Sequence, residues 1–257
     1  RLPEMLRHQW LIQCRELLEK TGDEPQAPPN LVLPGSHCPA CKTPLRPWHN
    51  IPLLSFLFLR GKCAYCKAPI SRRYPLLELF TALVTLQAGI HFGLTLQLAA
   101  ALFLAWSLIA LSAIDIDHQL LPDGITLPLL WAGFLVNLFE LFVPLMSAVI
   151  GAMAGYLILW LIYQLHHRLT GKEGMGYGDF KLLAALGAWM GWQKLPLIIL
   201  LAAVTGTLIA LFMMIRKGHG RDVPIPFGPY LTLAGWIAII WGDQLIASYL
   251  QFAGIDG

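Results

Sequence analysis

The chain has 257 residues, of which 56% are hydrophobic and 13% are charged, and its formal net charge is +3. Soluble domains carry about 25% charged residues. The composition therefore excludes a disordered chain, a collagen-like chain and an ordinary water-soluble enzyme, and so small a net charge gives no reason to expect a nucleic-acid partner.

Residues 1–73 form a polar, Pro-rich segment that holds 11 of the 18 basic residues. The apolar spacing within residues 4–19 predicts a short amphipathic helix, and residues 22–30 have the composition of a loop. The apolar patch 51–59 is too short to span a bilayer, so we expect it to pack on the membrane surface or on the metal site described next. The opening residues Arg1-Leu2-Pro3 begin no apolar stretch, so we expect no cleavable signal peptide in the sequence given.

Four of the five cysteines form two C-x-x-C pairs separated by 21 residues: Cys38, Cys41, Cys63 and Cys66. Four thiolates at this spacing suit tetrahedral Zn²⁺, and a site closed by four sulfurs is usually structural. The pattern predicts a small zinc-ribbon-like domain over about residues 31–73. A redox dithiol or buried free thiols remain as alternatives, and His37 or His49 could compete as ligands.

Seven apolar runs follow the polar segment, and no Lys or Arg occurs in residues 74–167. Most of the runs approach the roughly 20 residues that a membrane-spanning helix needs. The run over 180–193 is shorter and is expected to be tilted or re-entrant. The runs are 75–92, 95–114, 125–143, 145–165, 180–193, 196–215 and 229–250. We expect an all-α, polytopic membrane domain over residues 74–257, with interfacial belts formed by Trp131, Trp160, Trp189, Trp192 and Trp241.

The positive charges predict the orientation of these spans. If residues 1–73 are cytoplasmic and the seven runs cross in turn, 17 of the 18 basic residues lie on the cytoplasmic side, and only Lys194 lies outside. This distribution satisfies the positive-inside rule. The second span then ends, and the fifth begins, at the cytoplasmic face.

Two aspartates lie at that face, Asp115 near the end of the second span and Asp179 at the start of the fifth. Ionisable groups at membrane depth are candidates for function. Two facing carboxyls can share a proton, so one activates water while the other donates to a carbonyl oxygen, as in aspartic proteolysis. Glycines at 174, 176 and 178 would let a substrate strand approach closely. Two alternatives remain open: a helix N-cap role for Asp179, and a proton- or cation-coupled transporter.

The chain closely resembles the bifunctional type IV prepilin peptidases, the Gly-x-Gly-Asp membrane aspartic proteases, and most of all the pseudomonad-type enzymes of Gram-negative bacteria. The resemblance covers essentially the whole chain, although the first membrane span usual in the family is expected to be missing. It rests on Arg1-Leu2-Pro3, the two C-x-x-C pairs, Ile114-Asp115, Leu120-Leu121-Pro122-Asp123, Gly176-Tyr177-Gly178-Asp179-Phe180-Lys181 and Pro226-Phe227-Gly228-Pro229-Tyr230.

The resemblance implies both the activity and the site. Asp115 and Asp179 would be the catalytic pair, and the four cysteines would hold a structural zinc. The substrates would be type IV prepilins and type II secretion pseudopilins, cut after a Gly at the cytoplasmic face of the inner membrane. The new N-terminal residue, usually Phe, would then be methylated from S-adenosylmethionine, whose site the sequence does not locate. Fallback or supporting residues are Asp117, Asp123, Gly176, Gly178 and Lys181. A peptidase without methylation is a simpler alternative.

Overall fold

The computed structural model describes residues 2–17, 35–171, 174–217 and 226–254, so the predicted loop over 22–30 lies outside the described residues. The chain divides into an N-terminal unit, residues 1–86, and a C-terminal unit, residues 87–257. Each unit is described here by itself. Our division into functional segments at residue 73 stays a prediction.

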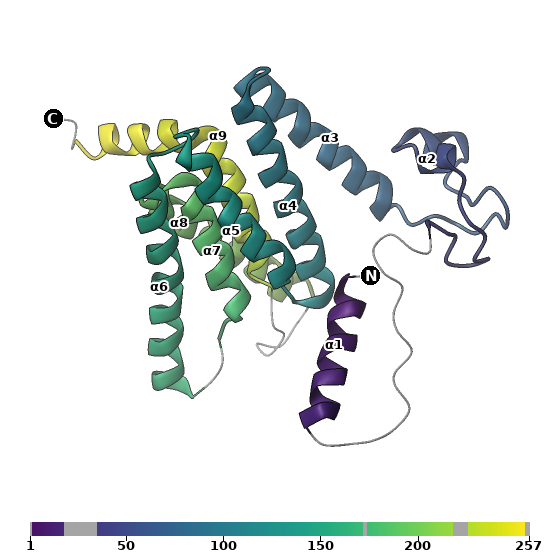
Figure 1. Ribbon diagram of the computed structural model, residues 1–257, viewed down its shortest axis with the longest axis horizontal. Coiled ribbons are helices and arrows are strands. Elements are labelled where there is room, and N and C mark those ends of the chain that lie inside the picture. The colour runs from purple at the N-terminus through teal and green to yellow at the C-terminus, as the bar shows by residue number, and fades with distance from the viewer. Residues whose placement is uncertain (1, 18–34, 172–173, 218–225, 255–257) are drawn as a thin grey trace. The chain divides into compact units, whose positions relative to one another are not determined.

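Within residues 2–17 and 35–86, the N-terminal unit has three elements and the first part of a longer helix (Figure 1). They are α1 (Leu2–Leu17), the 3₁₀ turn η1 (Pro47–Asn50), α2 (Leu54–Phe58) and α3 (Arg73–Phe92). The amphipathic helix predicted for residues 4–19 is confirmed over its described part. The apolar patch 51–59 includes α2, whose Leu57 and Phe58 side chains are exposed. The Glu78 carboxylate accepts a hydrogen bond of 2.8 Å from the backbone N–H of Leu53, which ties α3 to the start of α2.

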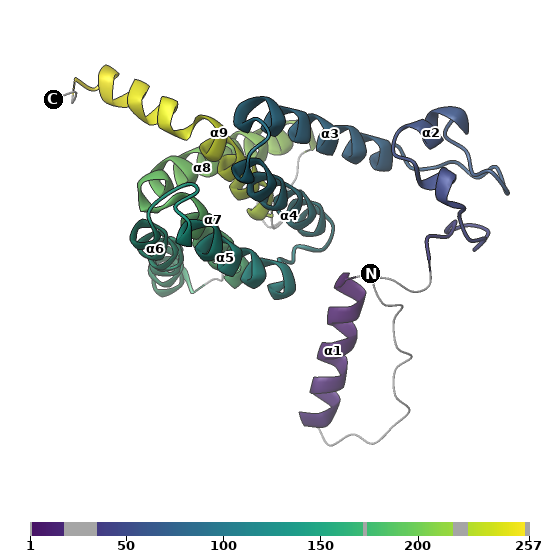
Figure 2. The same ribbon diagram turned by 45° about the horizontal axis from the view of Figure 1, so that its top comes forward.

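The described residues of the C-terminal unit form six α-helices (Figures 1 and 2). They are α4 (Leu96–His118), α5 (Asp123–Leu138), α6 (Leu145–Thr170), α7 (Tyr177–Met190), α8 (Leu195–Lys217) and α9 (Gly228–Phe252), with the 3₁₀ turn η2 (Trp192–Lys194) before α8. With α3, a helix stands at each of the seven predicted runs. The described residues contain isolated β-bridges but no strand, so the all-α fold class is confirmed.

Five of these segments are long and apolar enough to cross a membrane: Arg73–Phe92, Leu96–His118, Leu145–Thr170, Trp192–Ile215 and Gly228–Phe252. The chain is therefore a multi-pass membrane protein. The other two helices, α5 and α7, are shorter, with 16 and 14 residues. For α7 the sequence already predicted a short element.

The early end of α5 has a local cause in the buried side chain of Asn137. Its amide nitrogen donates to the carbonyls of Ala188 and Trp189 at 2.8 and 3.0 Å. Its oxygen accepts from the backbone N–H groups of Phe142 and Val143 at 3.2 and 3.1 Å. The side chain thus satisfies backbone groups where the chain turns, and the predicted run 125–143 becomes a helix followed by a turn.

Helix α7 forms the core of the C-terminal unit. Figure 2 shows it among α5, α6, α8 and α9, and every residue from Leu182 to Met190 is buried. Gly151 and Gly155 of α6 allow this close approach, because a Cβ at either position would collide with backbone atoms of α7. A short helix surrounded by protein needs no apolar length to match the bilayer, which accounts for its 14 residues.

Trp189 of α7 corrects one sequence-based expectation. We predicted it to lie in an interfacial belt, but the side chain is fully buried. Its indole N–H donates to the carbonyl of Leu129 at 2.8 Å, and its ring stacks on Phe103. A buried indole needs a partner for its N–H group, and the backbone of α5 provides it.

Candidate active site and metal centre

Asp115 lies in the last turn of α4 and is buried, with only 5% of its surface exposed. Its Oδ2 atom accepts a hydrogen bond of 3.1 Å from the backbone N–H of Gly228, at the first residue of α9. Asp117 is exposed, because residues two apart on an α-helix point about 200° apart. Of these two candidates from the second predicted span, only Asp115 faces the interior of the bundle.

Asp179 lies in the first turn of α7 and is 7% exposed. Gly176, in an extended conformation, is the N-cap of this helix, and its carbonyl accepts from the backbone N–H of Asp179 at 3.2 Å. The interpretation of Asp179 as an N-cap residue is therefore wrong. The position inside the first turn places its carboxyl at the positive end of the helix dipole.

Leu121 packs between the segment that carries Asp179 and the turn that contacts Asp115. Its buried side chain packs against Gly178 on one side and Gly228 on the other. A Cβ at Gly178 would lie 2.8 Å from the Leu121 Cβ atom, and a Cβ at Gly228 would lie 2.6 Å from Asp115 Oδ2. Both glycines therefore permit close approaches that any side chain would prevent.

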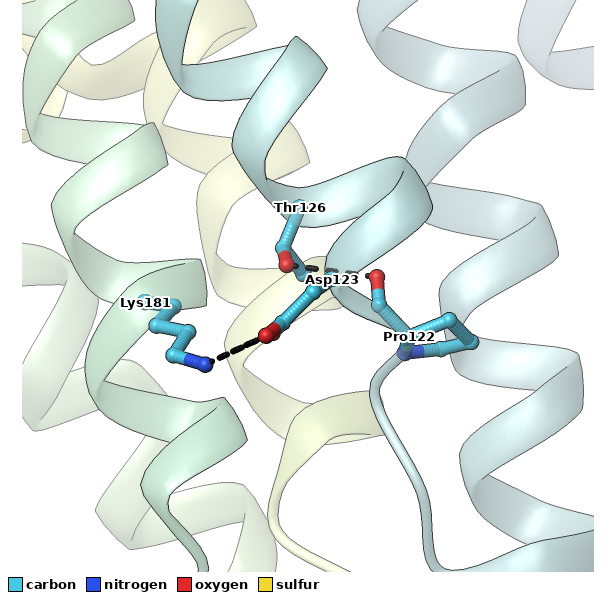
Figure 3. A network of polar contacts seen from close by, with 4 residues as sticks. All are labelled: Pro122, Asp123, Thr126 and Lys181. Atoms are coloured by element: carbon cyan, nitrogen blue, oxygen red, sulfur yellow. Dashed lines mark hydrogen bonds and ion pairs between the residues drawn. The ribbon is translucent and has the colours of Figure 1, made fainter. Parts of the chain in front are cut away.

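A salt bridge links the starts of α5 and α7 (Figure 3). Lys181 Nζ lies 2.7 and 2.8 Å from the two carboxylate oxygens of Asp123. In the same turn of α5, the hydroxyl of Thr126 donates to the carbonyl of Pro122 at 3.2 Å. The ion pair is partly exposed, so it contributes little to stability. It connects the turn of α7 that follows Asp179 with the first residue of α5.

The two buried carboxyls are close enough for their charges to interact, although they are 64 positions apart in the sequence. Two neighbouring buried carboxyls cannot both ionise at low cost, so a pair of this kind can share one proton. An acid and a base on one site can activate water against a carbonyl group. The same arrangement can also bind and release a proton, so geometry alone leaves both chemistries available.

The four cysteines form two nearly identical loops in the N-terminal unit. A β-bridge closes each loop, between His37 and Pro44 in the first and between Lys62 and Pro69 in the second. The backbone hydrogen bonds repeat as well: Cys38 N–H donates to Thr43 at 3.0 Å, and Cys63 N–H donates to Ala68 at 2.8 Å. The residue after each second cysteine, Lys42 or Lys67, has a positive φ.

The sulfur positions fit a tetrahedral metal ion. All four Sγ atoms lie within 4.8 Å of one another, and the Cys38 and Cys66 sulfurs are 3.8 Å apart. Zn–S bonds of about 2.3 Å give a tetrahedron with edges of about 3.8 Å. The cluster could therefore hold a metal ion.

Sequence reasoning missed the contact between Gly228 and Asp115. The Pro-Phe-Gly-Pro turn around Gly228 was visible in the sequence, but no spacing rule connects it with a carboxylate 113 positions away. Leu121 was likewise seen only as part of a motif. The signal that could have suggested both roles is a glycine or leucine inside a Pro-containing turn next to an apolar helix.

Comparisons with known proteins agree with the family that the sequence resembles. Residues 102–211 match the model of the type IV leader peptidase family, and residues 6–92 match that of the bacterial peptidase A24 N-terminal domain. The chain is 55% identical to the prepilin leader peptidase/N-methyltransferase of Pseudomonas aeruginosa, over 99% of this chain and 88% of the relative. The proteins of the same name from Aeromonas hydrophila and Legionella pneumophila are 52% and 47% identical over 97% and 98% of this chain, and over 87% and 88% of those relatives. No solved structure was found to match significantly.

The fold and site define a polytopic membrane protein with a buried pair of aspartates and a four-cysteine cluster. Identity at this level over nearly the full length makes the family assignment secure, and the chain belongs to the type IV leader peptidase family. The comparisons give no support to the transporter alternative.

Proposed function

We propose that this protein is a membrane aspartic endopeptidase that removes the basic leader of type IV prepilins and type II secretion pseudopilins and then methylates the new N-terminus. The observation that carries the proposal is the pairing of Asp115 and Asp179, two buried carboxyls brought together from separate helices. Relatives named prepilin leader peptidase/N-methyltransferase support both activities.

In the proposed mechanism the two aspartates share one proton. The ionised carboxylate takes a proton from water as the water attacks the scissile carbonyl, and the protonated carboxyl donates its proton to the carbonyl oxygen. Collapse of the tetrahedral intermediate returns a proton to the departing amine. The Gly228 N–H holds Asp115 in a fixed orientation, since a hydrogen bond to a carboxylate is stronger than one between neutral groups.

Supporting residues have distinct parts in this proposal. Gly178 and Gly228 admit Leu121 and Asp115, and the pair of Asp123 with Lys181 braces the helix turn that carries Asp179. Gly176 has no atom of the described residues within 4 Å of the position of a Cβ, so it leaves room beside Asp179. This room is where a substrate strand would approach.

The four cysteines would hold a structural Zn²⁺, which would link the two loops of the N-terminal unit. A closed four-sulfur site leaves no open position for a substrate, so the metal would supply rigidity and no step of the chemistry. S-adenosylmethionine would be the methyl donor. The orientation proposed is multi-pass in the inner membrane of a Gram-negative bacterium, with the site and the four cysteines at the cytoplasmic face, as the distribution of basic residues favours.

The test is an assay of the purified protein in detergent with a full-length prepilin, with and without S-adenosylmethionine. The expected products are a mature pilin in both reactions and a pilin heavier by one methyl group only when the cofactor is present. Intact-protein mass and N-terminal sequencing distinguish them. A protein that leaves the prepilin uncut, while it folds and binds metal normally, would contradict the proposal.

A further inference from the structure

The short helix α2 of the N-terminal unit presents an apolar face to its surroundings. The side chains of Leu54, Leu57 and Phe58 are 52%, 75% and 83% exposed. Their spacing of three and four residues places them on one side of the helix. Exposure of this extent does not fit packing on the metal site, which was one of the two positions expected for the patch 51–59.

Hydrogen bonds hold both ends of α2. At its start, the backbone N–H of Leu53 donates to the carboxylate of Glu78 in α3 at 2.8 Å. Beyond its end, the N–H of Gly61 donates to the carbonyl of Phe56 at 2.9 Å, and the Gly61 carbonyl accepts from Ile70 at 2.8 Å. Ile70 directly follows the β-bridge that closes the second cysteine loop. The apolar face is therefore attached both to α3 and to that loop.

The bond to Glu78 sets the level of α2 along α3. The helix α3 is long and apolar enough to cross a membrane, and its 20 residues extend for about 30 Å, which is the thickness of the hydrocarbon core. Glu78 is in the second turn of α3, about 7.5 Å from its start at 1.5 Å per residue. The start of α2 is therefore tied to the part of the span that lies near the membrane boundary.

Basic side chains flank the apolar face. Arg60 and Lys62 follow α2 in the chain, Arg72 precedes α3, and all three are exposed. Segments that lie in a membrane interface combine apolar side chains with Lys and Arg in this way. The apolar groups enter the acyl region, while the long basic side chains keep their charges among the lipid phosphates.

We propose that α2 is a membrane anchor, whose apolar face enters the leaflet at the N-terminal end of α3. The bilayer is the occupant that the structure favours, because α2 is bonded to a helix that this same leaflet would surround. The anchor would hold the second cysteine loop against the membrane surface. This inference does not depend on the proposed catalytic activity, since no step of it uses the two aspartates.

Quenching of fluorescence by labelled lipids tests the depth of α2. A fluorescent amino acid replaces Phe58 in the full chain, which is reconstituted in vesicles of phosphatidylethanolamine and phosphatidylglycerol with nitroxide groups on the acyl chains. The matched control carries the same amino acid at Ser36, an exposed polar position before the first cysteine pair. We expect quenching at position 58 to be at least about twofold stronger than at position 36, because interfacial helices bury their apolar face by about 5–10 Å. Equal quenching at the two positions, with aqueous iodide reaching both alike, would overturn the inference.

Photo-crosslinking identifies what covers the face. With benzoylphenylalanine at position 58, we expect phospholipid adducts in the mass spectrum of the protein, and none with the same amino acid at position 36. Adducts only with a second copy of the chain, with the C-terminal unit or with an added prepilin would identify a protein contact and contradict the anchor. Thermal unfolding in detergent checks that each variant folds. Leu57, which is also exposed, is the second position for both probes if the variant at position 58 unfolds.

Discussion

The contact between Gly228 and Asp115 makes a sharp prediction for Gly228→Ala. The new Cβ would lie 2.6 Å from Asp115 Oδ2, well inside the 3.0 Å below which such contacts are essentially never seen. The carboxylate must therefore move by several tenths of an ångström, and its 3.1 Å hydrogen bond lengthens or breaks. A hydrogen bond to a charged group is worth about 1.5–3 kcal/mol. If this stabilisation is lost in the transition state, kcat falls about 10- to 100-fold.

The assay is steady-state cleavage of purified prepilin in detergent, followed by gel shift, with thermal unfolding measured on the same samples. Gly124→Ala is the matched control, because a Cβ there meets no atom of the described residues within 4 Å and the residue is in the turn that contains Asp123. The control should keep the wild-type rate. A Gly228→Ala protein that cuts prepilin at the rate of this control would refute the argument that the Gly228 backbone positions Asp115.

Three further predictions concern the fold and the metal. Gly176→Ala should leave the melting temperature unchanged and raise KM. Gly178→Ala should lower the free energy of unfolding by about 1–3 kcal/mol, because the new Cβ overpacks the interior. Equal melting temperatures for the two variants would contradict this difference. Asn137→Ala should lower the free energy of unfolding, measured with denaturant, by about 3 kcal/mol or more, since it leaves several buried backbone groups unpaired. A decrease below about 1 kcal/mol would show that water replaces the amide. Cys63→Ser should lose bound zinc, measured by mass spectrometry, because it removes one of the four thiolate ligands. Cys14→Ser should keep the metal, and unchanged zinc content in both variants would exclude the four-cysteine site.

Much of the fold was predictable from hydropathy, because apolar runs bounded by polar turns mark helices directly. Each of the seven predicted runs contains a helix. The regular spacing of the cysteine pairs likewise predicted their gathering into one cluster. Charge distribution predicted that Asp115 and Asp179 share one end of the bundle. Both side chains are buried, and Leu121 packs against Gly178, next to Asp179, and Gly228, which contacts Asp115.

The features of the fold and the site that the sequence did not predict depend on contacts that sequence periodicity does not encode. At the end of α5, the Asn137 oxygen accepts from the turn that follows, and its nitrogen donates to residues about 50 positions away. Hydropathy alone does not register these bonds, so it made that helix too long. The amphipathic indole of Trp189 favoured an interfacial position, but the short α7 is enclosed by other helices, so this side chain is buried. Gly228 lies between Phe227 and Pro229, which carry no ionisable group, so the sequence gives no sign of a polar contact there. Only the folded chain reveals that the Gly228 N–H donates to Asp115.

Isosteric replacement of the two aspartates tests the central claim most directly. Asp115→Asn and Asp179→Asn keep the side-chain shape but remove the carboxyl, so each variant should fold normally and lose prepilin cleavage. Asp117→Asn, at an exposed position on the same helix, should retain it. The account predicts no detectable mature pilin from either of the first two variants. Cleavage that survives Asp115→Asn or Asp179→Asn in a folded protein would contradict the paired-aspartate site.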